Sequence, residues 1–241
     1  MNRVKQRPYA RAKYRGRRTG KRIFRVLLFL VSVLLTFTAG IVVVGVVRGV
    51  SFKQDNVAEW LEKVIKGNNV PDEIELPDYI TEDLLTKNEY SRPGTKLTQV
   101  NAVVIHYVGN PGTTAEQNRS YFQSLAETGS TYASSNLIVG LEGEVLLCVP
   151  LDEVAYCSNS RNDDTVSIEF CHPDETGKPT DTTYDSLVRL TAWLCSLYGL
   201  DPEDGIIRHY DITGKICPKY FVEHEDAWTQ FKQDVSTAME S

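Results

Sequence analysis

The sequence lacks several features that would narrow its function at once. It has no internal repeat and no compact Cys-x-x-Cys or His-x-x-x-His pair, the spacings that mark small zinc-binding modules. Residues 1–25 hold no acidic side chain against eleven Lys or Arg. Residues 49–241 have the opposite bias, with 14 basic side chains against 32 acidic ones and a formal net charge of −18. This negative charge argues against nucleic acid as a partner of the larger segment.

Residues 26–47 form an uncharged, strongly apolar run that ends at Arg48. At about 1.5 Å rise per residue, a helix of this length spans the roughly 30 Å hydrocarbon core of a bilayer. The run is longer than the apolar part of a signal peptide, which normally has about 7–15 residues. We therefore expect a single-pass signal anchor in the cell membrane. Residues 1–25 would be a cytoplasmic tail attracted to anionic membrane lipid, and everything after Arg48 would be extracytoplasmic.

The exported part divides into two segments. Residues 48–91 contain a short amphipathic pattern over 55–66, followed by Asn and Pro residues typical of loops, and we interpret them as a stalk. Within it, residues 67–91 are either a spacer or an extra flap on the domain that follows. Residues 92–241 alternate between apolar runs and helical patterns, and at roughly 150 residues this segment is long enough to bury its own core. The sequence indicates no particular protein partner.

The second segment predicts an α/β domain with a mixed central β-sheet flanked by helices, preceded by the one N-terminal transmembrane helix. Strands are expected at 102–107, 137–141, 144–149, 165–170 and 205–208, with a tight hairpin turn at 142–143. Helices are expected after a capping-box pattern at 113–116, running to about residue 128, and over about 183–198 and 223–237.

Three widely separated side chains have the chemistry of a catalytic zinc site. His209 lies at a predicted strand end and is followed eight residues later by Cys217, while His106 lies near the end of another predicted strand. A catalytic zinc ion takes three nitrogen or sulfur ligands and leaves a fourth position open for water. Two His and one Cys favour Zn²⁺. Spacing alone is weak support, because an isolated His at a strand end is more often a structural residue.

Two charged residues are further candidates for a functional role. Glu169 falls inside the apolar run 166–170, where an unpaired carboxylate is costly, and this suggests a functional role. Lys215 precedes Cys217 by two residues and is open to two interpretations, a functional cation or a solvated turn residue.

The remaining His and Cys residues stay outside the predicted site. His172 and His224 match no motif and are expected at the surface. Four cysteines other than Cys217 permit three full disulfide pairings or none, and the sequence leaves this open. They are Cys148, Cys157, Cys171 and Cys195.

Four blocks of sequence, in this order, resemble one enzyme family. They are residues 104–113, 134–140 with Gly143, 166–169 and 209–218. On these blocks, the stretch from about residue 92 to 235 resembles the zinc-dependent N-acetylmuramoyl-L-alanine amidases, a family that also includes phage amidases and peptidoglycan recognition proteins. The resemblance implies the same mixed-sheet fold and a zinc ion bound by His106, His209 and Cys217. It also implies that Glu169 is the acid/base carboxylate and that Lys215 stabilises developing negative charge.

The implied activity is hydrolysis of the amide bond between N-acetylmuramic acid and L-alanine in peptidoglycan or muropeptides. Zinc lowers the pKa of bound water from about 15.7 towards about 7, and a nearby carboxylate can pass the proton to the leaving amine. The alternative is a non-catalytic module that recognises muropeptides in the same groove. The complete ligand set argues against it, because inactive recognition proteins commonly lack the Cys. An anchored structural protein, the third alternative, would bind no stoichiometric metal.

Two positions depart from the family pattern. Ser135 and Asn136 stand where many relatives have a Tyr that assists catalysis, followed by His or Asn, so we expect no such Tyr role here. Cys157 stands where relatives often have His, and we do not assign it to the site.

Overall fold

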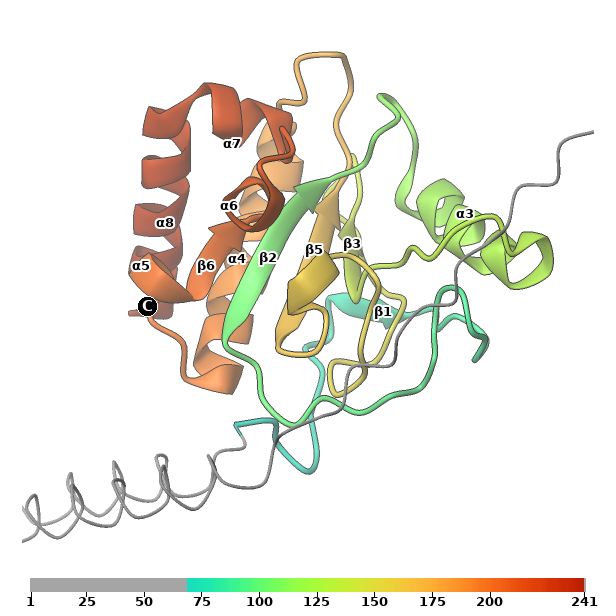
Figure 1. Ribbon diagram of the computed structural model, residues 1–241. Coiled ribbons are helices and arrows are strands. Elements are labelled where there is room, and N and C mark those ends of the chain that lie inside the picture. The colour runs from blue at the N-terminus through green and yellow to red at the C-terminus, as the bar shows by residue number, and fades with distance from the viewer. Residues whose placement is uncertain (1–68, 241) are drawn as a thin grey trace, which may run out of the picture. The chain divides into compact units, whose positions relative to one another are not determined.

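A computed structural model of the protein describes residues 69–240 (Figure 1). The predicted basic tail at 1–25, the apolar run at 26–47 and the amphipathic pattern at 55–66 lie outside this range. Within residues 69–240, no helix is long and apolar enough to cross a membrane.

The central sheet has six strands in the order β1-β4-β3-β5-β2-β6. The strands are β1 (Ile80–Glu82), β2 (Ala102–Tyr107), β3 (Leu137–Val139), β4 (Val145–Leu147), β5 (Thr165–Phe170) and β6 (Ile206–Arg208). Only β3 and β4 pair antiparallel, and all other neighbours are parallel. The prediction of a mixed sheet is therefore confirmed. The predicted hairpin turn joins β3 to β4, with Gly143 at φ +83°, a conformation that favours glycine.

Helices cover both faces of the sheet (Figure 1). They are α3 (Ala115–Thr128), α4 (Asp181–Tyr198), α5 (Pro202–Gly205), α6 (His209–Thr213), α7 (Lys219–Glu223) and α8 (Glu225–Met239), with a short 3-10 turn η1 (Asn159–Arg161). The capping box of α3 uses Thr114 and Gln117, one residue later than the sequence pattern indicated. The last predicted helix, at about 223–237, corresponds to α8, and the short helix α7 precedes it, separated by a break at His224.

Alternation along the strands divides the core into two layers, because successive side chains point to opposite faces of a sheet. One layer packs under α4 and α8 and includes Val103, Ile105, Leu187, Leu190 and Phe231. The other packs under α3 and includes Ala115, Phe122, Ile138 and Leu146. With both faces covered, the carboxyl-end edge of the parallel strands is left as the place where polar side chains can gather.

Residues 69–91, which the sequence pattern grouped with a stalk, pack as part of this domain. The Asn69 side chain donates hydrogen bonds to the carbonyls of Val100 and Tyr198 and accepts one from the Val100 backbone N–H. The segment then contributes β1 to the sheet, and Leu85 is fully buried.

Candidate metal centre

The register of the parallel strands brings the predicted site residues to one edge of the sheet. His106 on β2 is directly opposite Glu169 on β5. Ile105 is opposite Arg208 on β6, so His209, which follows Arg208, reaches the same level. These strands therefore place two imidazoles and a carboxylate together, although the three residues are far apart in the sequence.

Cys217 reaches the site through a tight return of the chain after α6. Gly214, with φ +77°, ends that helix, and the Tyr210 backbone N–H donates to the Cys217 carbonyl at 2.9 Å. Arg208 holds the start of α6 in place, because its guanidinium contacts the carboxylates of both Asp211 and Glu225. His209 and Cys217 are thereby fixed on either side of a short, braced turn.

The three predicted ligands form one compact, buried group. His106 Nδ1 lies 3.8 Å from Cys217 Sγ, and the rings of His106 and His209 have centroids 4.6 Å apart. One ligand atom from each of the three residues lies within 4.8 Å of the other two. Zn–N and Zn–S bonds of about 2.0–2.3 Å place two ligands of one tetrahedral zinc ion at comparable separations. The donor set and its spacing therefore fit zinc.

A second observation supports this fit. His209 Nδ1 is buried and has no hydrogen-bond partner among the described residues, whereas Nε2 of the same ring lies 2.8 Å from Asn159 Oδ1. A buried polar atom without a partner costs free energy, typically about 1–3 kcal/mol. A metal ion bound at Nδ1 would satisfy it.

The protonation states of the ligands also follow from their surroundings. Burial, then the nearby charges of His209 and Lys215, holds the pKa of His106 well below 6.5, and burial and Lys215 likewise lower the pKa of His209. Both rings are thus neutral at neutral pH, as metal ligands must be. Burial and the Glu169 charge raise the pKa of the Cys217 thiol to about 12, so zinc binding would have to displace its proton.

Glu169 is held in the same group. Its Oε1 accepts a hydrogen bond from the Cys157 thiol at 3.7 Å, while Oε2 is buried with no hydrogen-bond partner among residues 69–240. Burial raises the pKa of this carboxyl to about 8, against the opposing charge of Lys215. His106, Cys157 and Glu169 also form a second set of closely spaced donor groups. Cys157, left out of the predicted site, is therefore in contact with it.

Lys215 is exposed, and its positive charge affects the pKa values of several site residues. It lowers the pKa values of both His106 and His209 and opposes the rise in the pKa of Glu169. This placement is compatible with the predicted role in stabilising negative charge, which stays a prediction.

Ser135 and Asn136, the first departure from the family pattern, have structural roles. Asn136 is fully buried, and its Nδ2 donates to the carbonyls of Pro150 and Glu153. The Ser135 hydroxyl, also buried, donates to the Leu137 carbonyl. Asn136 thereby connects the start of β3 to the chain that follows β4, and the Ser135 hydroxyl also contacts Ser167 on β5.

The sequence-based reading of the remaining His and Cys residues needs one correction. His172 is 1 % exposed, and its two ring nitrogens contact the carbonyls of Asp174 and Val108 at 2.7 and 2.8 Å, so the expected surface position is wrong. The buried position is accommodated because a backbone carbonyl is in reach of whichever ring nitrogen carries the proton. His224 is exposed, as predicted. All five cysteines are free.

The sequence analysis did not identify Ser158 and Asn159 as site residues. Ser158 contacts Nε2 of His106, and Asn159 contacts Nε2 of His209. The available signal was a polar run at 158–164 immediately after Cys157.

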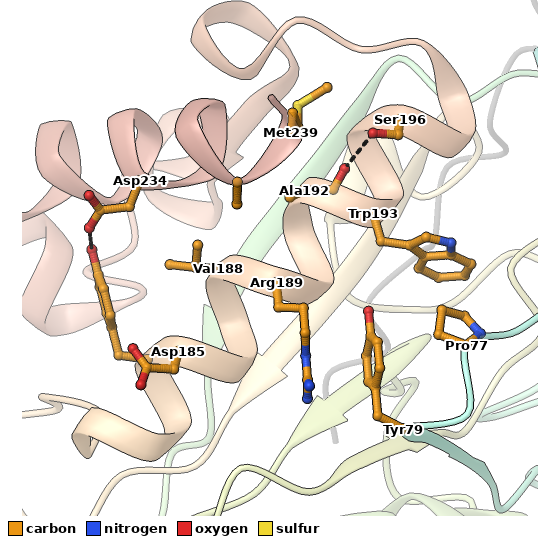
Figure 2. A pocket seen from close by; sticks show the side chains of 12 residues that line it. Pro77, Tyr79, Asp185, Val188, Arg189, Ala192, Trp193, Ser196, Asp234 and Met239 are labelled. Carbon is orange, nitrogen blue, oxygen red and sulfur yellow. Dashed lines mark hydrogen bonds between the residues drawn. The ribbon is translucent and has the colours of Figure 1, made fainter. Parts of the chain in front are cut away.

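A separate pocket, between α4, α8 and the segment with Pro77 and Tyr79, contains none of the predicted site residues (Figure 2).

Comparison with known proteins gives a consistent result. The family described as N-acetylmuramoyl-L-alanine amidase matches residues 96–220. The N-acetylmuramoyl-L-alanine amidases BlyA of Bacillus subtilis and CwlL of Bacillus licheniformis are 34 % and 31 % identical to this chain over 182 and 172 residues. Each alignment covers 66 % of this chain and 47 % of the relative, so the chain spans about half the length of these curated relatives.

Solved structures show the same fold. The catalytic domain of XlyA has a TM-score of 0.55 at 21 % identity, covering 65 % of this chain and 98 % of that one. The catalytic domain of PlyG has a TM-score of 0.56 at 23 % identity, covering 66 % and 94 %. Because the family match extends over more than half of the sequence, this chain belongs to the N-acetylmuramoyl-L-alanine amidase family.

Proposed function

We propose that this protein is a membrane-anchored, zinc-dependent amidase that hydrolyses the bond between N-acetylmuramic acid and L-alanine in peptidoglycan. The observation that carries the proposal is the meeting of His106, His209 and Cys217 in one buried group, with Glu169 directly opposite His106. Family membership supports the choice of substrate bond.

The chain's own residues suit the reaction. A zinc ion bound by the two His and the Cys would supply a Lewis acid and activate water for attack on an amide. Burial raises the pKa of Glu169 to about 8 without a metal, so the carboxyl holds its proton near neutral pH. The positive charge of a bound zinc ion would lower this pKa and favour the carboxylate, which can accept a proton from water and return it to the leaving nitrogen. The positive charge of Lys215 would stabilise the oxyanion that develops during attack, a contribution typically worth about a hundredfold to a thousandfold in rate.

Membrane attachment rests on the sequence of residues 1–48. The basic segment, the apolar run and the acidic remainder have the charge order of a signal anchor. Fractionation of cells that express the full chain tests this: the protein should sediment with membranes and resist salt extraction, and a variant lacking residues 1–48 should not. Release of the full chain by salt would refute the anchor.

The activity test uses the full chain, purified in detergent with zinc, and isolated peptidoglycan. Mass spectrometry should detect stem peptides with a free L-alanine amine. Glu169→Gln should abolish their release while retaining zinc, and His209→Ala should lose both. His224→Ala, which removes an exposed imidazole, is the matched control and should retain both properties.

Other outcomes separate the alternatives. Stoichiometric zinc with intact peptidoglycan, together with binding of soluble muropeptides, would favour a recognition module. A protein that takes up no zinc would refute the metal site.

A further inference from the structure

We propose that the loop 157–162 orients both histidine ligands, with Asn159 as the positioning residue for His209 and Ser158 as that for His106. This inference rests on the proposed metal site and goes beyond it by assigning the residues that select which ring nitrogen faces the metal. The proposal starts from one observation: a single short loop contacts Nε2 of both His106 and His209, which lie on or directly after different strands.

Asn159 determines the tautomer of His209. Its Oδ1 lies 2.8 Å from His209 Nε2, and an amide oxygen can only accept a hydrogen bond. In a neutral imidazole one nitrogen carries the proton and the other presents a lone pair. Nε2 therefore carries the proton, and the lone pair is on Nδ1, the buried nitrogen without a partner in the described structure.

Ser158 has the corresponding place beside His106. It is 1 % exposed, and its Oγ lies 3.5 Å from His106 Nε2, whereas His106 Nδ1 lies 3.8 Å from Cys217 Sγ. In both rings, then, Nε2 faces the loop and Nδ1 is the nitrogen available to the metal. Partners of this kind, outside the ligands themselves, fix ring orientation and typically affect metal affinity by about 10–100-fold.

The conformation of the loop explains why these positions are specific. Asn159 has φ +52° and is the only non-glycine residue between 69 and 240 with a positive φ. Asn and Asp tolerate this left-handed region better than other side chains except glycine. The loop is held by the Asn162 Oδ1, which accepts from the backbone N–H groups of Cys157 and Ser158 at 3.2 and 2.6 Å. The backbone is thus braced in a conformation that aims the Asn159 amide at His209.

Two substitutions of Asn159 separate the side chain from the backbone. Asn159→Gly removes the acceptor but permits the positive φ, whereas Asn159→Asp retains both an acceptor oxygen and tolerance of that φ. Ser160→Gly, at an exposed position of the same loop, is the matched control for added backbone freedom.

The first measurement is zinc affinity of the full chain, by competition with a fluorescent chelator. Asn159→Gly should weaken zinc binding about 10–100-fold, and Asn159→Asp and Ser160→Gly should stay within about threefold of the parent protein. Equal affinity of Asn159→Gly and the parent, or failure of Asn159→Asp to bind more tightly than Asn159→Gly, would overturn the inference.

The second measurement needs neither zinc nor activity. Long-range ¹H–¹⁵N NMR of the metal-free chain reports which imidazole nitrogen carries the proton. His209 should be protonated at Nε2 in the parent and become a mixture of tautomers in Asn159→Gly. A parent protein with His209 protonated at Nδ1 would refute the assignment, even if peptidoglycan is cleaved. If the tautomer and the zinc affinity change as expected but the protein leaves peptidoglycan intact, the proposed function is refuted and the inference about the loop still holds.

Discussion

Replacing Glu169 with Gln should stabilise the metal-free protein while removing the carboxylate that the proposed reaction needs. Within the part of the chain that the structure describes, Oε2 of Glu169 is buried without a partner, and Oε1 receives only the long hydrogen bond from the Cys157 thiol. Burial therefore raises the pKa of the carboxyl to about 8. Gln has nearly the same shape and no charge, so it avoids the cost of ionising a group in this position.

The direction and size of the effect follow from proton binding. With an unperturbed pKa of 4.5 in the unfolded chain and about 8 in the folded one, the folded state holds one proton more between these pH values. Its stability therefore falls as pH rises through this window. Each pH unit corresponds to about 1.4 kcal/mol, which sets an upper limit of about 5 kcal/mol for the loss. Glu169→Gln should match the parent near pH 4.5 and exceed its stability by about 2–5 kcal/mol above pH 8.

Urea unfolding of both proteins, in the presence of a chelator and followed by tryptophan fluorescence, measures this difference. Other titrating groups are present in both proteins, so they cancel in the comparison. Glu142→Gln, at an exposed position, controls for loss of a carboxylate at the surface. A difference between the parent and Glu169→Gln that does not grow from about pH 5 to about pH 8.5 would refute the reasoning, because it would mean that the carboxyl ionises as readily as in water.

Two further predictions concern a buried ion pair and the cysteines. Arg92→Ala should lower the free energy of unfolding by about 3 kcal/mol, because Glu153, 2 % exposed, loses the guanidinium bonded to it at 2.8 Å. Denaturant titration measures this loss, and a value below about 1 kcal/mol would be typical of a solvated pair instead. Cys148 and Cys195 should react with a thiol reagent only on unfolding, since burial blocks access and raises the pKa of each thiol to about 12. Pulse labelling and mass spectrometry check this, and rapid native-state labelling would contradict it.

Local patterns predicted most of the secondary structure. The apolar run at 102–107 became β2 at Ala102–Tyr107, and the run at 165–170 became β5 at Thr165–Phe170. The first four residues of β2 are continuously apolar, as in a strand buried on both faces, and β5 alternates apolar with polar residues. Both signals are complete within a few residues. β1, at Ile80–Glu82, was missed because it is a three-residue edge strand with two exposed side chains. Only its pairing with β4 makes it a strand.

The sequence predicted the proposed metal ligands but not the residues that contact them, because those contacts join distant segments of the chain. His106, His209 and Cys217 were found through blocks of sequence that resemble a family. Asn159 was not, because its role depends on a contact with a residue fifty positions away. Cys157 was not assigned because relatives often have His at its position, and its contact with Glu169, from a loop to a strand, appears only in the tertiary structure. Neither contact leaves a periodic pattern in the sequence.

The sequence by itself determined the types of chemical group available, the alternation of strands and helices, and the charge contrast between residues 1–25 and the remainder. These are local properties, set by each residue and its near neighbours. The tertiary structure alone decided that His106 faces Glu169, that one loop contacts both histidines, and that Nδ1 of His209 has no partner among the described residues. Strand register and burial decide such contacts, and both depend on how distant segments pack together.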